Sequence, residues 1–259
     1  MISLGNKPIS FVYHGNELVY PNPVNQNLLL WYDFKGLTND SSNKEISKDL
    51  NNMYDGKLNN FSYTENNSYD KEGLLFDGID DFIDVTEFKT TSLNNLNEFS
   101  FEFILEFTDS NKRGAIINMP MSERLDASIR LLIKVNENKS ITIGRYNGLW
   151  KGYKTIPLNE EKIHCVVLFN EFDTIPEDSG FEVKFIINNK EIEKASFTSS
   201  SEYYGMPYNN LVLGWHGTAT LGEYSFLKEK LIMTRIYDRL LTLDEIDYNY
   251  KLEKERCGL

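Results

Sequence analysis

Cysteine is scarce in this chain of 259 residues, which holds only Cys165 and Cys257. Two cysteines so far apart do not form the dense framework of a small secreted domain, so no disulfide is required. The three histidines form no pair at ligand spacing, which argues against a transition-metal site. No apolar run approaches the roughly 20 residues of a membrane span, and residues 1–10 lack a basic stretch followed by an apolar one. We therefore expect no membrane partner and no export signal.

Basic residues are outnumbered, because 27 Lys and Arg stand against 39 Asp and Glu, giving a formal net charge of -12. Nucleic-acid binding needs clustered Lys and Arg that displace counterions from phosphate, so we expect no nucleic-acid partner. The acidic side chains are interpreted first as a solvated surface that favours solubility. Aromatic residues make up 13% of the chain, which favours strands, where rings pack well on a pleated surface.

Alternation of apolar and polar residues is clearest between Phe99 and Phe107. Every odd position there is apolar, so these side chains share one face of a strand, while Glu102 and Glu106 lie on the other face. Similar patterns or short apolar runs predict further strands at residues 28–34, 73–76, 82–85, 115–118, 129–135, 141–146, 163–169, 181–187, 211–214 and 230–237. The segment 38–70 is rich in Asn, Ser and Asp and is interpreted as an irregular connection.

The two ends of the chain carry different signals. Residues 2–20 alternate around glycine turns and predict a small hairpin unit, and the prolines at positions 21 and 23 favour a linker at about residues 21–26. Near the other end, Thr242 and Glu245 have the spacing of a capping box, and Leu243, Ile246 and Tyr250 share one helical face. We predict a short helix that ends near Glu255. The domains are then a hairpin segment, 1–24, and a main body, 25–259.

Many strands, one terminal helix and frequent turns predict an all-β fold, an antiparallel two-sheet jelly-roll sandwich. The order of segments resembles the laminin-G-like or concanavalin-A-like jelly-roll family over nearly all of residues 28–254. The matching phrases lie at residues 28–34, 40–43, 54–56, 75–85, 186–190 and 230–246. The resemblance implies a binding fold that works outside the cell, and some members hold one calcium ion beside the loop that resembles residues 78–82.

The N-terminal unit has a second resemblance. Residues 9–21 are similar to hairpins near the start of many tailed-bacteriophage structural proteins. This implies attachment to a virion through Ile9, Phe11, Tyr13, Leu18 and Tyr20. Release by host lysis would also explain why an outward-acting fold has no export signal.

Catalysis is not expected from the carboxylates of the strand 99–107. The layout of Glu102 and Glu106 resembles laminarinase-like glycosidases, but those place Asp between two Glu residues and here the middle position is Ile104. Residues four apart on a strand are separated by about 13 Å, whereas a retaining pair needs carboxyl groups at roughly 5 to 5.5 Å. Both are expected to be solvent-facing. His164 and Cys165 point to opposite faces and cannot form a dyad.

Binding residues are expected in three aromatic loops, where stacking rings lie beside polar groups that can bond sugar hydroxyls. The candidates for carbohydrate binding are Arg145, Tyr146, Trp150, Tyr153, Tyr203, Tyr204, Trp215 and His216. No cofactor is required, but a structural Ca²⁺ could be held by oxygen ligands from Asp80, Asp81 and Asp33. The competing interpretation of the aspartates is that they bond loop amides.

We therefore predict a bacteriophage virion protein, a tail fibre or a head fibre or decoration component, whose jelly roll binds host-surface or environmental glycan. It is expected not to be an enzyme, to contact other virion proteins through residues 1–24, and to be located in the virion. A homotrimer is one expected state, because fibres commonly trimerise. Two alternatives stay open: a glycoside hydrolase on the same scaffold, and a purely structural capsid or tail subunit.

Overall fold

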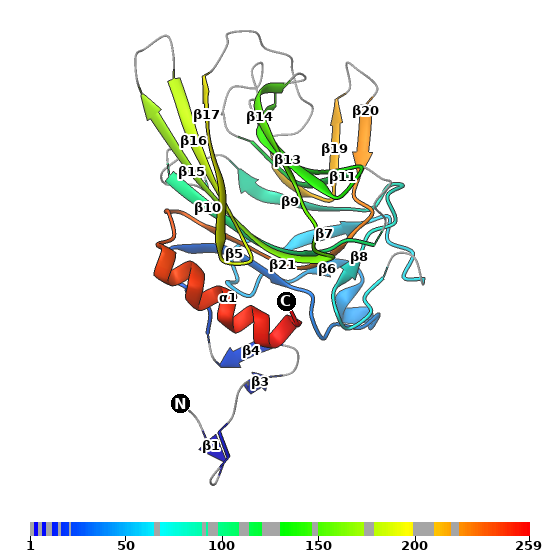
Figure 1. Ribbon diagram of the computed structural model, residues 1–259. Helices are drawn as coiled ribbons and strands as arrows, with labels where there is room; N and C mark the ends of the chain where they lie inside the picture. Colours follow the sequence, from blue (N-terminus) through cyan, green and yellow to red (C-terminus); the bar gives the residue numbers. More distant parts are fainter. Residues whose placement is uncertain are drawn as a thin grey trace.

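The computed structural model of the protein describes residues 3–4, 7–8, 12–14, 17–20, 22–64, 68–89, 92, 98–108, 114–120, 130–146, 150–173, 179–198, 210–218 and 223–259. Two antiparallel sheets dominate this part of the chain (Figure 1). They confirm the predicted all-β sandwich with one C-terminal helix.

The seven-stranded sheet has the order β17 (Lys190–Thr198), β16 (Ser179–Ile187), β15 (Lys162–Asp173), β10 (Glu98–Glu106), β21 (Lys230–Tyr237) and β5 (Leu28–Asp33), with β8 (Leu74–Leu75) also paired to β21. The eight-stranded sheet has the order β14 (Trp150–Pro157), β13 (Ser140–Tyr146), β12 (Arg130–Asn136), β11 (Gly114–Pro120), β18 (Asn210–Leu213), β9 (Phe82–Lys89), β7 (Gly56–Asn59) and β6 (Ile46–Ser47). Three two-stranded units pair β1 (Ser3–Leu4) with β2 (Lys7–Pro8), β3 (Val12–His14) with β4 (Glu17–Tyr20), and β19 (Trp215–Thr218) with β20 (Glu223–Phe226).

Strand alternation places the core between the sheets. The odd-numbered side chains of β10 are buried in the main apolar cluster, from Phe99 to Phe107, which confirms the inward-facing pattern. Cys165 lies in the same cluster and His164 points to the opposite face, so the two do not form a dyad. The segment predicted to be irregular contains the short strands β6 and β7 and a 3-10 helix, Ser41–Asn43.

The helix α1 (Leu243–Cys257) begins with the predicted capping box, since Thr242 Oγ1 accepts from the Glu245 amide and Glu245 Oε2 accepts from the Thr242 amide. It covers the outer face of the seven-stranded sheet. Ile246 is buried in a second apolar cluster there, but Leu243 is 63% exposed, so the predicted apolar face is wrong at that position. No helix in the described ranges has the length and apolar character needed to cross a membrane.

Buried polar and charged side chains lie between α1 and the sheet, beside apolar ones. We call the following set the buried charge network: Asp33, Glu102, His164, Arg235, Tyr237, Asn249, Glu253 and Arg256. The Arg235 guanidinium bonds Glu102 and Glu253, and Arg256 bonds Glu253 and Asp33. Because α1 seals this face, Glu102 has no exposed area, and the expectation that it faces solvent is wrong.

Residues 22–27 are fastened to α1 and to the sheet edge. The Val24 amide donates to Asn249 Oδ1 at 2.9 Å, and the Tyr248 hydroxyl donates to the Asn22 carbonyl. Asn249 Nδ2 in turn donates to Glu102 Oε2, so the segment that precedes β5 is joined to the buried charge network. The strands β3 and β4 pair as a hairpin, with Tyr13 opposite Leu18.

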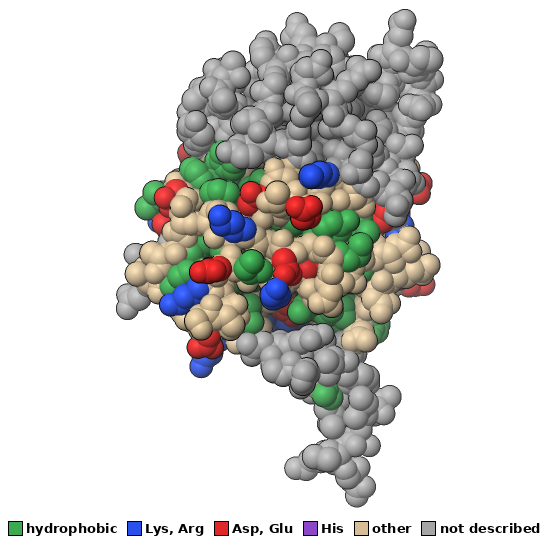
Figure 2. Space-filling model, turned by 180° about the vertical axis from the view of Figure 1, so that it is seen from behind, with side chains coloured by type: hydrophobic (Ala, Val, Ile, Leu, Met, Phe, Trp, Pro, Cys, Tyr) green, Lys and Arg blue, Asp and Glu red, His purple; other side chains and the backbone are tan. Residues whose placement is uncertain are grey.

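The predicted attachment residues Ile9 and Phe11 lie outside the described residues. Charge on the face shown in Figure 2 is mixed. Figure 2 shows Lys or Arg beside Asp or Glu across the described part of one face, with no broad area of a single sign there.

Candidate functional site

A polar groove lies on the outer face of β12, β13 and β14. We call it the Tyr153 groove; it encloses about 390 Å³ and is lined by Lys134, Asn136, Glu137, Asn138, Ser140, Thr142, Tyr153 and Thr155. The three strands are consecutive and antiparallel, and their register sets Lys134, Thr142 and Thr155 in one row. The alternate side chains, such as Ile133 and Ile141, point into the core. The period-2 rule therefore gathers the polar side chains on one side.

The turn between β12 and β13 forms one end of the groove. Asn138 and Lys139 have positive φ values of 67° and 51°. Three residues, Glu137, Asn138 and Lys139, separate the two strands, and consecutive positive φ values are typical of tight hairpin turns. The tight turn brings Asn136 opposite Ser140, and this places amide and hydroxyl groups side by side at the end of the hairpin.

Hydrogen bonds order the floor of the groove. Asn136 Nδ2 donates to Thr142 Oγ1 at 2.7 Å and to Ser140 Oγ at 3.2 Å. Thr142 Oγ1 and Thr155 Oγ1 lie 2.7 Å apart and share one hydroxyl hydrogen. The chain of bonds fixes the rotamers of the side chains, so the polar atoms are preorganised before any ligand arrives.

Tyr153 supplies an aromatic surface at the other side of the groove. Its side chain is 57% exposed, although it lies on a paired strand. Its cross-strand partner is Gly144, which has no side chain that could cover the ring. An accessible ring beside amides and hydroxyls can pack against the C–H face of a sugar while the polar groups bond its hydroxyls.

The other members of the predicted aromatic set have different outcomes. Arg145, Tyr146 and Trp150 are on β13 and β14, with Tyr146 paired to Trp150, so most of this segment is strand and the predicted loop is wrong. Their side chains lie outside the described part, as do Tyr203 and Tyr204 altogether.

Trp215 and His216 were expected in an exposed loop, but they are on β19 and are only 7% and 3% exposed. The Trp215 ring packs 5.4 Å from Phe82 and 6.0 Å from Phe226. The expectation of an open aromatic surface is therefore wrong for both. The short segment around Trp215 contains Gly214 and Gly217 and has no clear alternation of apolar and polar residues. The sequence therefore did not predict the β19–β20 hairpin in which Trp215 is buried.

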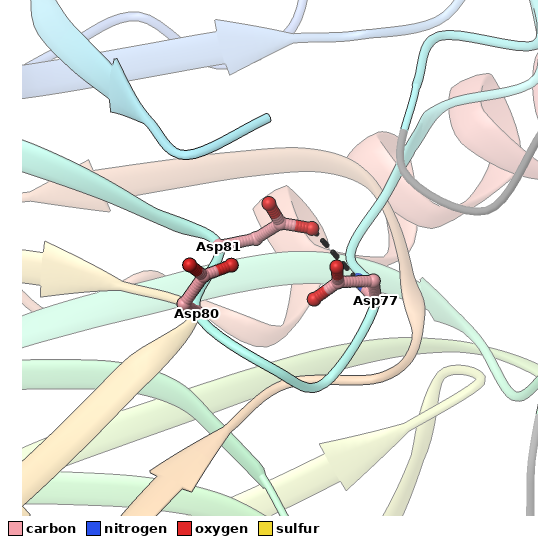
Figure 3. A group of neighbouring side chains, drawn as sticks. All are labelled: Asp77, Asp80 and Asp81. Atoms are coloured by element: carbon pink, nitrogen blue, oxygen red, sulfur yellow. Dashed lines mark hydrogen bonds between the residues drawn. The ribbon is translucent and has the colours of Figure 1, made fainter. Parts of the chain in front are cut away.

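An acidic loop lies between β8 and β9. Asp77, Asp80 and Asp81 each offer a carboxylate oxygen, and these atoms are within 4.8 Å of one another (Figure 3). Asp81 Oδ2 accepts from the Asp77 amide at 2.8 Å, and Asp77 Oδ1 accepts from the Ile79 amide at 2.7 Å. An all-oxygen donor set fits Ca²⁺, and the amide bonds fit the competing structural interpretation.

Asp33 lies apart from this loop, so the three residues predicted to hold calcium do not come together; the carboxylate that lies beside Asp80 and Asp81 is that of Asp77. Asp33 Oδ2 instead accepts from Arg256 Nη1 at 2.6 Å, in the buried charge network. Burial raises the pKa of Asp33, and the charge of Arg256 opposes that effect. Asp77 could have been found from the sequence, because it is in the same short loop as Asp80 and Asp81.

Glu102 and Glu106 occupy separate environments. Burial raises the pKa of Glu102, but the charge of Arg235 and the hydrogen bonds from His164 and Tyr237 outweigh it and hold the pKa at about 2. Glu106 is bound by Lys230 and Lys162 at the end of β10. Glu102 therefore acts as an anchor for α1, and these two residues do not form a glycosidase pair.

No family model matches the sequence, and no curated protein matches it. The structure is similar to that of Trypanosoma rangeli sialidase, with a TM-score of 0.55 and 12% identity over 89% of this chain and 33% of that chain. It is also similar to the binding domain of botulinum neurotoxin DC in complex with SialylT, with a TM-score of 0.52 and 10% identity over 87% of this chain and 51% of that one. The binding domain of botulinum neurotoxin serotype C1 is similar with a TM-score of 0.53 and 11% identity, over 87% of this chain and 52% of that one.

These likenesses define the chain as a two-sheet β-sandwich of a kind found in sialidases and in toxin binding domains. At such low identity they show a shared fold, and the chain spans about a third of the sialidases and about half of the toxin domains. The prediction that the chain is not an enzyme is contradicted, because sialidases are among the structures that share the fold.

Proposed function

We propose that this chain is a carbohydrate-binding protein of the laminin-G-like type and that the Tyr153 groove is its binding site. The main support for this proposal is the exposed ring of Tyr153, which lies beside an ordered row of amide and hydroxyl groups. Loop and strand residues on a rigid sandwich are suited to binding, because the scaffold fixes their positions before the ligand arrives.

The structural neighbours support a glycan as the ligand. One toxin binding domain is described in complex with SialylT, and cell entry of botulinum neurotoxin type C, another neighbour, is described as dependent upon interaction with two ganglioside molecules. A sialidase neighbour is described in complex with 2,3-difluoro-KDN, a sugar acid derivative. These ligands belong to those proteins; for this chain they favour a saccharide over other small molecules.

A glycan array tests the proposal directly. Binding is expected for the unmodified chain and is expected to fall roughly tenfold or more in Tyr153→Ala, because the stacking surface is removed. Tyr153→Phe keeps the ring and is expected to retain most of the affinity. Silence of the unmodified, folded chain on the array would refute glycan binding and would favour a purely structural subunit.

We further propose that the protein is a bacteriophage virion component, a tail fibre or a head fibre or decoration protein, attached through its N-terminal segment. The phage-like phrase at residues 9–21 and the firm attachment of residues 22–27 to α1 support this proposal. Mass spectrometry of purified virions tests the location and the virion partners, and native mass spectrometry tests the homotrimer. Absence of the chain from purified virions would end this proposal without affecting glycan binding.

A glycoside hydrolase is the second candidate function, because sialidases share the fold. The assay is release of sugar from sialosides and β-glucans by the full chain. Release that persists in Glu102→Gln and Glu106→Gln would place the catalytic groups elsewhere, as the buried position of Glu102 predicts.

A further inference from the structure

The pattern of donors and acceptors in the Tyr153 groove restricts the class of ligand. Thr142 and Thr155 have two hydroxyl hydrogens between them, and one is used in the bond that links the two oxygens. Asn136 Nδ2 is itself a donor to Thr142, so it cannot accept the second hydrogen. Thr142 is only 5% exposed, whereas Thr155 is exposed, so when Thr142 donates in the link the Thr155 hydroxyl keeps its hydrogen for a ligand acceptor.

The same groove also presents an acceptor. Asn136 Nδ2 donates to Thr142 Oγ1 and lies within hydrogen-bond distance of both Ser140 Oγ and the Ser140 carbonyl, which orients the amide with its carbonyl oxygen on the other side. Within the described residues, no group donates a hydrogen bond to Asn136 Oδ1. A ligand here therefore meets one donor and one acceptor a few ångströms apart, and adjacent sugar hydroxyls can satisfy both because each can donate and accept.

Charge in the groove favours a neutral ligand. Lys134 and Glu137 contribute one cation and one anion, and both are engaged in other interactions. A carboxylate group can only accept hydrogen bonds, so a carboxylate placed at this position would leave Asn136 Oδ1 without a donor and would lie near Glu137. The chain as a whole carries a formal charge of -12, which repels an approaching anion.

We infer that the Tyr153 groove takes a neutral glycan whose hexose units carry adjacent hydroxyls, and not an acidic, sialylated one. This rests on the proposed function. It distinguishes this chain from its structural neighbours, which are described with 2,3-difluoro-KDN, SialylT or gangliosides.

The test is an array that pairs each neutral glycan with its sialylated derivative, such as lactose with sialyllactose. The strongest signals are expected from neutral glycans and are expected to be lost in Tyr153→Ala. Sialylated members that bind about tenfold more tightly than their neutral partners, or neutral binding that does not depend on Tyr153, would overturn the inference while leaving glycan binding intact. Silence across the array would instead refute the proposed function itself.

Calorimetry with the best neutral glycan gives an independent check. Thr155→Val keeps the side-chain shape and is expected to weaken binding about 3- to 10-fold through loss of one hydrogen bond, whereas Thr155→Ser is expected to bind like the unmodified chain. Raising NaCl from about 50 mM to about 500 mM is expected to change Kd less than about twofold, because screening acts only on charged partners. A Kd that rises steeply with salt would contradict a neutral ligand.

Discussion

Replacing Arg235 by Met should destabilise the protein strongly, because its guanidinium compensates two buried carboxylates. Arg235 bonds Glu102 and Glu253, all three side chains have no exposed area, and the guanidinium also lies 4.9 Å from the centre of the Trp31 ring. Removing one partner of a buried ion pair leaves an uncompensated charge, which costs about 3 to 5 kcal/mol.

The pKa of Glu102 leads to a similar magnitude. Its environment lowers the pKa from the ordinary value of 4.5 to about 2, and a shift of that size corresponds to about 3 kcal/mol of preference for the charged form. The assay is urea unfolding at pH 7, where Arg235→Met is expected to lose about 3 to 5 kcal/mol with an unchanged m-value.

Arg239→Met is the matched control, because the Arg239–Glu245 pair is partly exposed and should cost about 1 kcal/mol or less. Adding Glu102→Gln and Glu253→Gln to Arg235→Met is expected to recover part of the loss, since no unpaired charge would then be buried. A loss below about 1 kcal/mol in Arg235→Met would refute the reasoning, as would a loss equal to that of Arg239→Met.

Further predictions concern acid, a glycine, the helix cap and calcium. Because the folded chain holds Glu102 at a lower pKa than the unfolded chain, its contribution is complete above pH 4.5 and is lost as the pH falls toward 2; acid titration of unmodified protein and Glu102→Gln should show this difference. Gly214 has φ +86° and an added Cβ would clash with the Phe76 ring, whereas Gly258 has φ +68° and an added Cβ would meet open space. Gly214→Ala should therefore lower Tm far more than Gly258→Ala. Equal losses of Tm would contradict the close contact between Gly214 and Phe76. Thr242→Ala should lower the free energy of unfolding by about 1 kcal/mol in chemical denaturation, and Thr242→Ser should leave it almost unchanged. Equal stability of these two variants and the unmodified chain would show that the cap does not stabilise the protein. Ca²⁺ added after chelation should raise Tm in the unmodified chain and not in Asp80→Asn, and no rise in either would contradict the predicted calcium site.

Local patterns were enough to predict the sandwich and its capped helix. Phe99 to Phe107 alternate strictly, and Thr242 with Glu245 specifies the helix start, so both features depend on nearby residues alone. The outer face of β10 could not be predicted in the same way. A polar side chain such as Glu102 on a strand face normally indicates solvent, and only the three-dimensional packing of α1 shows that it is sealed.

The candidate site was predicted in part. Tyr153 was selected for its aromatic ring and is the one member of the set whose side chain is described as exposed. Asn136, Thr142 and Thr155 were missed, although they alternate with apolar residues, because every outward strand face shows such a pattern. Only the register of β12, β13 and β14 shows which polar side chains meet.

The join between Val24 and Asn249 has a mechanical consequence. Asn249 connects the backbone at Val24 to Glu102 in the middle of β10. A force that pulls on the chain before Val24 would therefore be transmitted to the seven-stranded sheet through these hydrogen bonds. The Tyr153 groove opens from the other sheet, on the side away from α1. A body held by residues 22–27 would therefore keep that opening turned away from its support, at a fixed angle.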